Sequence, residues 1–344
     1  EHSKPGTTSS ILTLEDRNNF TQKVQNVQCG LCGNHCQMTV SVFQDGKRFI
    51  TGNRCDRPIT GKSNDDTLNL YAYKQQQLSQ LMKNPGTGTR GKIGIPMVLN
   101  MYELLPFWHA FFTNLGFQVI VSPFSNRKLY QAGQGSIPSD TVCFPAKLTH
   151  GHIMALLKKD VDAIFYPCMS YNIDEGLGDN HYNCPVVAYY PEFLAGNIRE
   201  LEDTKFIYEY LNLEQRKDFV RLMPKIMRKY YPDLKTSDIH NAIEVAYTAY
   251  RKHMEDTRKE AERMMTEARN EGKRIIVLAG RPYHVDPEVN HGIDKLIIQH
   301  GACVITEDSI SNLVQKFDTS VLNQWSYHSR LYAAAKYCVN HADM

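Results

Sequence analysis

The chain has 344 residues, of which 42% are hydrophobic and 22% are charged, and its formal net charge is +2. This length is too great for one ordinary core and predicts two or three domains, while the small net charge gives no electrostatic reason to expect nucleic acid or a membrane surface as a partner. No apolar run approaches the length of a membrane span.

The first 60 residues are distinguished by cysteines. Residues 1–26 are polar and predict a tail or linker. Four cysteines follow with the spacing C-x2-C-x3-C-x18-C: Cys29, Cys32, Cys36 and Cys55. The alternating run 38–50 is interrupted by Asp45-Gly46, which predicts a β-hairpin that brings the fourth cysteine back beside the CxxC turn.

This spacing predicts that residues 27–60 form a metal module. Zinc and a 4Fe-4S cluster both accept four thiolates, so either could occupy it. Two disulfides in a secreted domain, or free thiols, are the alternatives. The nine cysteines are an odd number, and the polar start EHSKPGTTSS lacks an apolar signal core, which favours a reducing cytoplasm. A start without methionine suggests a piece of a longer or processed protein.

From residue 61 onwards the sequence pattern predicts an α/β fold. Residues 61–91 predict a helix with a linker at each end, and residues 92–197 predict a first α/β lobe. Strands alternating with helices indicate βαβ units and a parallel sheet. In this lobe the predicted strands are 92–100, 117–123, 161–168 and 184–191, and the predicted helices are 103–116 and 145–160.

The remaining residues predict a helical insert and a second lobe. Residues 198–273 contain two long amphipathic patterns, 212–231 and 238–272, with i, i+4 charge pairs in the second. Residues 274–344 predict a second α/β lobe. Its strands are expected at 273–280 and 302–307, and its helices at 288–301 and 326–341.

Three further cysteines lie at predicted element ends in the first lobe. Cys168 ends a strand, Cys143 immediately precedes a helix, and Cys184 is expected to begin the next strand. Ligands bind at strand ends of open parallel sheets, and a helix N-terminus stabilises a thiolate. The three thiols therefore predict a shared cofactor site. Each taken alone is better explained as a small buried hydrophobe.

A loop in the second lobe carries a cation and two histidines. The segment GRPYHVDPEVNHG, after a predicted strand, holds Arg281, His284, Asp286 and His291. This position predicts an anion site for a phosphate or carboxylate, with a capped surface loop as the alternative. The chain contains no GxGxxG, Walker A, HExxH or GxSxG motif, which argues against ordinary nucleotide-binding or hydrolase chemistry.

Long stretches of the sequence resemble the large acyl-CoA dehydratase activase-related proteins of anaerobic bacteria, relatives of the 2-hydroxyacyl-CoA dehydratase and benzoyl-CoA reductase systems. The stretches are CGLCGNHCQMTV with GNRCDRP, the run KIGIPMVLN to DAIFYPC, LAGRPYHVDPEVNHGIDKL and ITEDSI. The resemblance covers about residues 27–340. It implies the middle segment of such a protein, without the ATPase domains and with a truncated second lobe.

The resemblance also implies an iron–sulfur cluster held by three cysteines at the edges of Rossmann-like lobes. Cys143 and Cys168 match the first two ligands by context. The third is expected just after the helix that ends near Cys338, beyond Met344, with Cys184 as a substitute. We therefore expect two Rossmann-like or flavodoxin-like lobes with parallel sheets, the helical insert and the cysteine-rich module.

The implied function is iron–sulfur-linked electron transfer in an anaerobic system that activates dehydratases or reductases of CoA thioesters. ATPase activase domains and dehydratase-like subunits are the expected partners, a CoA thioester is a candidate ligand, and the expected location is the cytoplasm. The fragment alone is expected to show no ATPase or dehydratase turnover. The alternative function is a non-catalytic, zinc-stabilised docking module of a larger activase.

Overall fold

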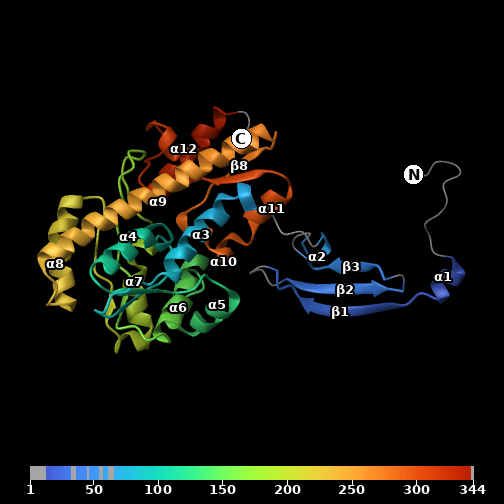
Figure 1. The fold of residues 1–344 in the computed structure, drawn as a ribbon, viewed down its shortest axis with the longest axis horizontal. Helices are drawn as coiled ribbons and strands as arrows, with labels where there is room; N and C mark the ends of the chain where they lie inside the picture. Colours follow the sequence, from blue (N-terminus) through green and yellow to red (C-terminus); the bar gives the residue numbers. More distant parts are fainter. Residues whose placement is uncertain (1–12, 32–35, 45, 54–56, 61–65, 342–344) are drawn as a thin grey trace. The chain divides into compact units, whose positions relative to one another are not determined.

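The computed structural model describes residues 13–31, 36–44, 46–53, 57–60 and 66–341 (Figure 1). The chain divides into two compact units, Glu1–Asn64 and Asp65–Met344. The second unit is mixed α/β, with parallel sheets and many helices, as the sequence predicts. In the described ranges, no helix is both long and apolar enough to cross a membrane.

The first unit contains a three-stranded antiparallel sheet. Its elements are α1 (Leu14–Asn18), β1 (Gln22–Gln28), β2 (Gln37–Phe43), β3 (Arg48–Thr51) and α2 (Arg57–Thr60). The predicted hairpin is present as β2 and β3, which pair antiparallel with Thr39 opposite Thr51. Gly46 lies in the turn with φ 77°, a left-handed conformation that glycine adopts without strain. β1 begins within the segment 1–26 that was expected to be a tail, and it pairs with β2.

The second unit contains a four-stranded parallel sheet in the order β5-β4-β6-β7. Its strands are β4 (Lys92–Ile95), β5 (Gln118–Val121), β6 (Ala163–Phe165) and β7 (Phe206–Ile207). The helices connected to them are α4 (Met101–Asn114), α5 (Arg127–Gly133), α6 (Phe144–Leu157) and α7 (Pro185–Asn197).

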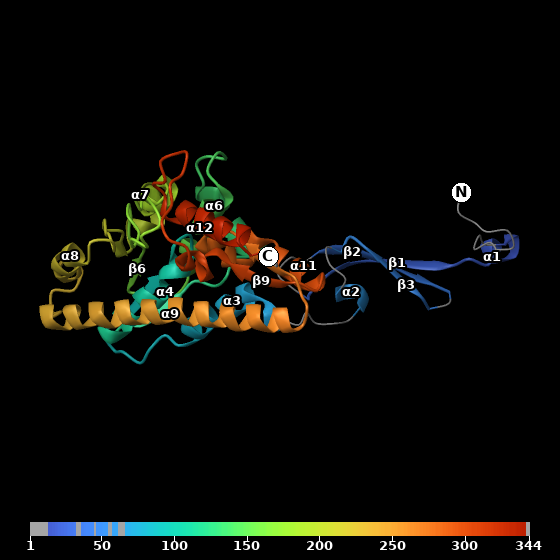
Figure 2. The same ribbon diagram turned by 90° about the horizontal axis from the view of Figure 1, so that it is seen from above.

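Aromatic side chains form much of the core beside this sheet. The Trp108 ring of α4 lies 4.6 Å from the Phe165 ring of β6, centroid to centroid, and Phe112 lies 4.8 Å from the same ring. Helix α4 is apolar on nearly every face because it also packs against the long helix α9 (Thr236–Asn270), which runs along the unit in Figure 2. The helix α8 (Arg216–Tyr230) packs against α9 as well.

A second, two-stranded parallel sheet consists of β8 (Ile275–Leu278) and β9 (Cys303–Thr306). Around it lie α3 (Leu70–Lys83), α10 (Pro287–Asn290), α11 (Ile293–Gln299) and α12 (Ser326–Val339). α3 precedes the first sheet in sequence, yet Asn69 at its start forms a parallel bridge with Val304 of β9. The Asn69 amide also donates to the Asp294 carboxylate at 2.9 Å.

The strand predicted at 184–191 is wrong, because these residues form most of helix α7. Proline at the first helical position needs no amide donor, so Pro185 fits a helix start. The buried residues Val187, Tyr190 and Leu194 repeat at helical spacing. Cys184 therefore begins a helix instead of a strand.

Two further predicted helical segments differ from the structure. The single helix expected at 288–301 is broken into α10 and α11 by His291 and Gly292, whose φ angles are 56° and 75°. Two consecutive left-handed residues cannot continue a right-handed helix. The segment 198–273, expected to be helical, contains β7 before α8 begins.

Candidate functional site

Cys143 and Cys184 occupy equivalent positions at the starts of two helices. Each is the N-cap residue, of α6 and α7 respectively, with φ −62° in both and ψ 150° and 152°. A proline follows within the first helical turn of each helix. The Cys184 sulfur accepts a hydrogen bond from the Val187 amide at 3.5 Å. The same local motif therefore presents a thiol at the N-terminus of two helices.

The third thiol, Cys168, lies just beyond the carboxyl end of β6. Its backbone amide donates to the Glu209 carbonyl at 3.0 Å, so the chain still runs beside the segment that follows β7. The next residue, Met169, donates to the Ala188 carbonyl of α7 at 3.0 Å. Asn183 donates in turn to the Ser170 carbonyl at 2.8 Å, which brings the segments that carry Cys168 and Cys184 side by side.

The environment of Cys168 differs from that of the other two thiols. Cys168 is buried, whereas Cys143 is exposed and Cys184 is partly buried. Burial raises the pKa of the Cys168 thiol to about 11, although a hydrogen bond from the backbone of Glu192 partly opposes this shift. The buried thiol is therefore protonated at neutral pH unless a metal replaces its proton.

The three cysteines share a neighbour in Tyr166, the residue directly after β6. Its side chain is 0% exposed, and its hydroxyl has no hydrogen-bond partner. Burial raises the pKa of Tyr166 well above its usual range, and negative charge on Cys168, Cys184 and Cys143 raises it further. All three thiols are thus close enough to Tyr166 to act on it electrostatically, although they come from three different elements.

Helix α6, which carries Cys143, is held in place by a close crossing with α5. A Cβ atom on Gly133 of α5 would lie 2.2 Å from the Gly151 amide nitrogen of α6, and one on Gly151 would lie 2.1 Å from the Leu129 carbonyl oxygen. Only glycine permits this approach of two backbones. The His150 ring of α6 bonds to the Tyr190 hydroxyl of α7 at 2.9 Å, which ties the two capped helices together.

The loop after β8 approaches the same region. It forms the short 3-10 helix η4 (Pro282–Val285). Burial raises the pKa of Tyr283 to about 12, while Arg281 lowers it and the thiols of Cys184 and Cys143 raise it, so this ring lies near both the cation and the thiols. Arg281 and the two capping cysteines thus both act electrostatically on Tyr283.

The His284 ring is hydrogen-bonded within its own loop. Its Nδ1 accepts the Arg281 amide at 2.7 Å, within the loop itself. The Arg281 guanidinium is hydrogen-bonded to His328 of α12 at 3.0 Å. Of the residues predicted for the anion site, Arg281 is paired with His328, and the contact of His284 organises the loop.

In the first unit, the structure describes two of the four predicted metal ligands. The Cys29 amide donates to the Cys36 carbonyl at 2.8 Å, so these cysteines lie together where β1 and β2 meet. β3 ends at Thr51, at the same end of the sheet. Cys32 and Cys55 lie outside the described residues. In the described parts of the chain, no group of three or more His, Cys, Asp or Glu side chains is arranged to hold a metal ion.

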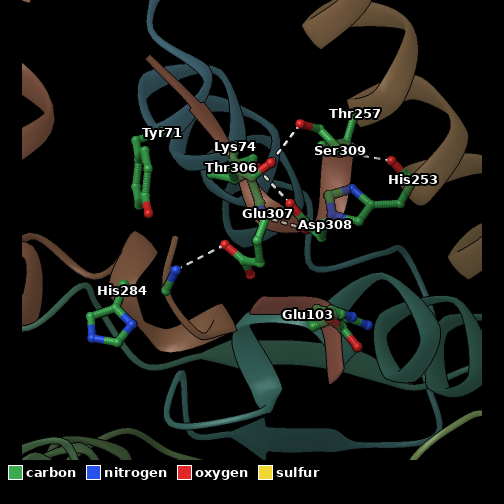
Figure 3. A network of polar contacts seen from close by, with 12 residues as sticks. Tyr71, Lys74, Glu103, His253, Thr257, His284, Thr306, Glu307, Asp308 and Ser309 are labelled. Atoms are coloured by element: carbon green, nitrogen blue, oxygen red, sulfur yellow. Dashed lines mark hydrogen bonds and ion pairs between the residues drawn. The ribbon is translucent and has the colours of Figure 1, made fainter. Parts of the chain in front are cut away.

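A buried polar network lies at the carboxyl end of β9, where sequence reasoning found no site (Figure 3). Lys74 of α3 pairs with Asp308 at 2.6 Å, and both side chains are buried. Asp308 also accepts a hydrogen bond from Thr306. Glu307 accepts the Gly280 amide at 3.1 Å. An acidic pair directly after an apolar strand, in ITEDS, was the available signal.

The carboxylates of this network differ in their affinity for a proton. Burial raises the pKa of Glu307 to about 7, and the negative charge of Asp308 adds to the rise, while Lys74 and Arg330 oppose it. For Asp308, burial acts in the same direction, but Lys74 and Arg330 outweigh it and lower the pKa. Asp308 is therefore the charged member of the pair and Glu307 the one that can hold a proton near neutrality.

Arg330 of α12 extends the network towards the first sheet. Its guanidinium contacts Glu103 of α4 and forms two hydrogen bonds with Glu175, at 2.6 and 2.9 Å. Tyr250 of α9 donates to the other Glu103 oxygen at 3.2 Å. One buried cation thus links two helices and the loop that follows Cys168.

The two histidines of α6 are structural. His152 lies between the hydroxyls of Ser122 and Ser125, at 2.7 and 2.8 Å, and burial lowers its pKa to about 3. Burial likewise lowers the pKa of His150 to about 4. Both rings are neutral across the physiological range.

Comparisons with known proteins gave one match. A family model described as "CoA enzyme activase uncharacterised domain" matches residues 92–310, which is more than half of the chain. This region contains the first sheet, the three capping and strand-end cysteines, the loop with Arg281 and the start of the buried network. No curated protein and no solved structure matches the sequence.

Proposed function

Because the chain belongs to the family of the CoA enzyme activase uncharacterised domain, we propose that it carries an iron–sulfur-linked electron-transfer step in an anaerobic system that activates CoA-thioester dehydratases or reductases. Membership of this family implies dehydratase-like partners in general terms. The finer proposal is that Cys143, Cys168 and Cys184 hold a cluster at the edge of the first sheet.

The donor set supports this proposal. The three thiols come from two helix caps and one strand end, charge on each of them raises the pKa of Tyr166, and thiolates are the ligands that iron–sulfur clusters require. The unpartnered Tyr166 hydroxyl is the single observation that carries the proposal, because a buried phenol without a partner indicates a polar group that the protein alone does not supply. A bound cluster would supply a low-potential one-electron carrier.

The residues of this chain have distinct tasks in the proposed site. Cys143 and Cys184 would each present a sulfur ligand from a helix N-terminus, and burial of Cys168 keeps water from the third. Arg281 provides a cation near the thiols, where it would offset the charge of an anionic group such as the phosphate or carboxylate of a substrate. The other two candidate thiols, Cys303 and Cys338, belong to a separate apolar cluster around β9.

The test is metal analysis of the full chain after anaerobic reconstitution with iron and sulfide. We expect the Cys168→Ala variant to lose about four iron atoms per chain relative to the parent, the content of one 4Fe-4S cluster. Cys303→Ala is the matched control, because burial raises the pKa of Cys303 to about 11, as it does for Cys168. Equal iron in the parent and Cys168→Ala would overturn the assignment.

One observation favours a second function, a metal-stabilised docking module in residues 27–60. The first unit exposes several apolar side chains. Val24 and Phe49 lie on its sheet, and Leu14, Phe20, Leu31 and Ile59 lie in its short helices and connecting segments. Exposed apolar surface of this kind is typical of an interaction site. In this proposal zinc or a cluster bound by Cys29, Cys32, Cys36 and Cys55 fixes the module, which binds the ATPase domains or a dehydratase-like subunit.

The metal content also separates these two functions. A brown, oxygen-sensitive chain with iron and sulfide outside the first unit supports electron transfer. A colourless chain with one zinc, lost in a Cys29→Ser variant, supports the docking module alone.

A further inference from the structure

A pocket of about 560 Å³ lies in the second unit, away from the cysteines. Its walls come from three segments: the middle of α9, the loop 173–177 and the short 3-10 helix η6 (Ser311–Leu313). Pockets of roughly 300–1,000 Å³ are typical of small-molecule sites. The side chains of this lining indicate which kind of molecule the pocket would take.

Two arginines of α9 line the pocket. Arg258 has a buried Nε atom without a hydrogen-bond partner. Arg251 lies seven residues earlier, about two turns along the same face of the helix, and its guanidinium reaches only the Thr248 hydroxyl, at 3.5 Å. Among the ion pairs between described residues, neither arginine takes part, whereas Lys252 and other cations of α9 pair with carboxylates of the same helix.

The carboxylates of the lining are already engaged elsewhere. Glu175 accepts two hydrogen bonds from Arg330, at 2.6 and 2.9 Å. Glu255 pairs with Lys259 at 2.6 Å, although Arg258 is three residues away on the same helix. Asp174 accepts a backbone amide at 2.7 Å, and its side chain is 57% exposed. The charge that the lining leaves without a partner is therefore positive.

Apolar side chains complete the pocket. Leu177 and Met254 line it and are 7% and 6% exposed, and the partly buried Ile173 lies beside them. A guanidinium presents its donors in a planar fork that matches a carboxylate, and an apolar wall beside it favours an aliphatic body. The lining thus fits a molecule that has both parts.

We infer that this pocket binds a small aliphatic carboxylate, whose charged end accepts hydrogen bonds from Arg258 and whose chain packs against Leu177 and Met254. Arg251 adds attraction for the anion from the same face of α9. The site shares no residue with the proposed cluster, so it stands or falls independently of the proposed function.

The experiment titrates the full chain with hexanoate and follows the methionine methyl groups by nuclear magnetic resonance. Met254→Leu, a change that conserves volume, identifies the Met254 signal. We expect saturable binding that shifts this signal, and binding at least about tenfold weaker in Arg258→Met, because hydrogen bonds to charged groups are among the strong ones. Hexanamide has nearly the same shape without the charge and should not bind.

Arg221→Met is the matched control, because it removes the same charge from an exposed pair with Asp218 outside the pocket, and it should bind hexanoate like the parent. Arg258→Met should unfold no earlier than the parent on heating, since its guanidinium has no partner to lose. A marked loss of thermal stability in this variant would show that Arg258 serves the fold and would overturn the inference.

Inorganic phosphate separates a carboxylate site from a general anion site. If phosphate shifts the Met254 signal and hexanoate does not, the assignment to an aliphatic carboxylate is wrong. Absence of saturable hexanoate binding, or equal binding in the parent and Arg258→Met, would likewise overturn it.

Discussion

Arg330 shows how strongly one buried cation holds this unit together. It is 1% exposed and neutralises the carboxylates of Glu103 and Glu175. Replacing it by methionine leaves two acidic groups without their partner, which we expect to lower the free energy of unfolding by roughly 3–5 kcal/mol. Denaturant unfolding measures this change. Lys252→Met breaks an exposed pair with Asp256 and should cost at most about 1 kcal/mol, and an equal loss in both variants would contradict the argument.

Glu307 gives the stability a predictable dependence on pH. Burial raises its folded pKa from the ordinary 4.5 to about 7, so the folded state binds the proton more tightly than the unfolded state. The stabilisation is complete below the unfolded pKa and is lost as pH rises through the folded one. We expect Glu307→Gln to gain about 1–3 kcal/mol relative to the parent between roughly pH 4.5 and pH 7.

Denaturant unfolding at several pH values tests this expectation. The exposed Glu262→Gln is the control and should follow the parent curve. A constant difference between Glu307→Gln and the parent across that range would show that Glu307 does not hold the proton.

The cysteines and the buried carboxylates differ in how far sequence could identify them. The C-x2-C-x3-C-x18-C spacing and the cysteine before a proline are local patterns, so candidate ligands could be named from the sequence. Lys74 and Asp308 lie 234 residues apart, and no local pattern reports that they meet. The unpartnered state of Tyr166 also depends on its three-dimensional surroundings alone.

At the scale of elements, alternating strands and helices were largely predictable from periodicity, but α7 was not. CPVVAYYP is rich in residues that favour strands, and the signal for a helix lay in the proline at its start and in Leu194, which lies beyond the predicted segment. The strand β7 has only two residues, Phe206 and Ile207, and carries no period of its own. The conformations of α7 and β7 therefore depend on tertiary packing more than on local sequence patterns.

Helix α3 lies outside the family match, which begins at residue 92, yet it packs against β9 of the second sheet. Lys74 neutralises Asp308, and Tyr71 donates to the Leu278 carbonyl at 2.8 Å. A chain that begins at Lys92 should therefore lose roughly 3–5 kcal/mol, because Asp308 becomes a buried, unpaired charge. A chain that begins at Asp65 keeps α3 and serves as the control. Equal thermal stability of the two chains would show that α3 is dispensable.

For the whole molecule, the division into Glu1–Asn64 and Asp65–Met344 predicts separable responses to metal loss. Cys32→Ser removes one expected ligand of the first unit, and structural metal sites contribute folding free energy directly. We expect this variant to lose one metal centre and to be cleaved by protease within residues 13–60. The thermal transition of the second unit should not move. Unchanged metal content and unchanged protection would contradict the four-cysteine site.

The position of α3 also has a consequence during synthesis. Lys74 leaves the ribosome 234 residues before Asp308, the carboxylate it pairs with, and Asn69 leaves 225 residues before Asp294. At about 5–20 residues per second, these side chains wait roughly 10–50 s for their partners. During that interval the first sheet and α9 are made, so the nascent chain can assemble its larger core, including the packing of α3 on α4 and α9, while Lys74 and Asn69 still lack their partners. The contacts of α3 with β9 are then made last, although α3 was among the first helices to emerge.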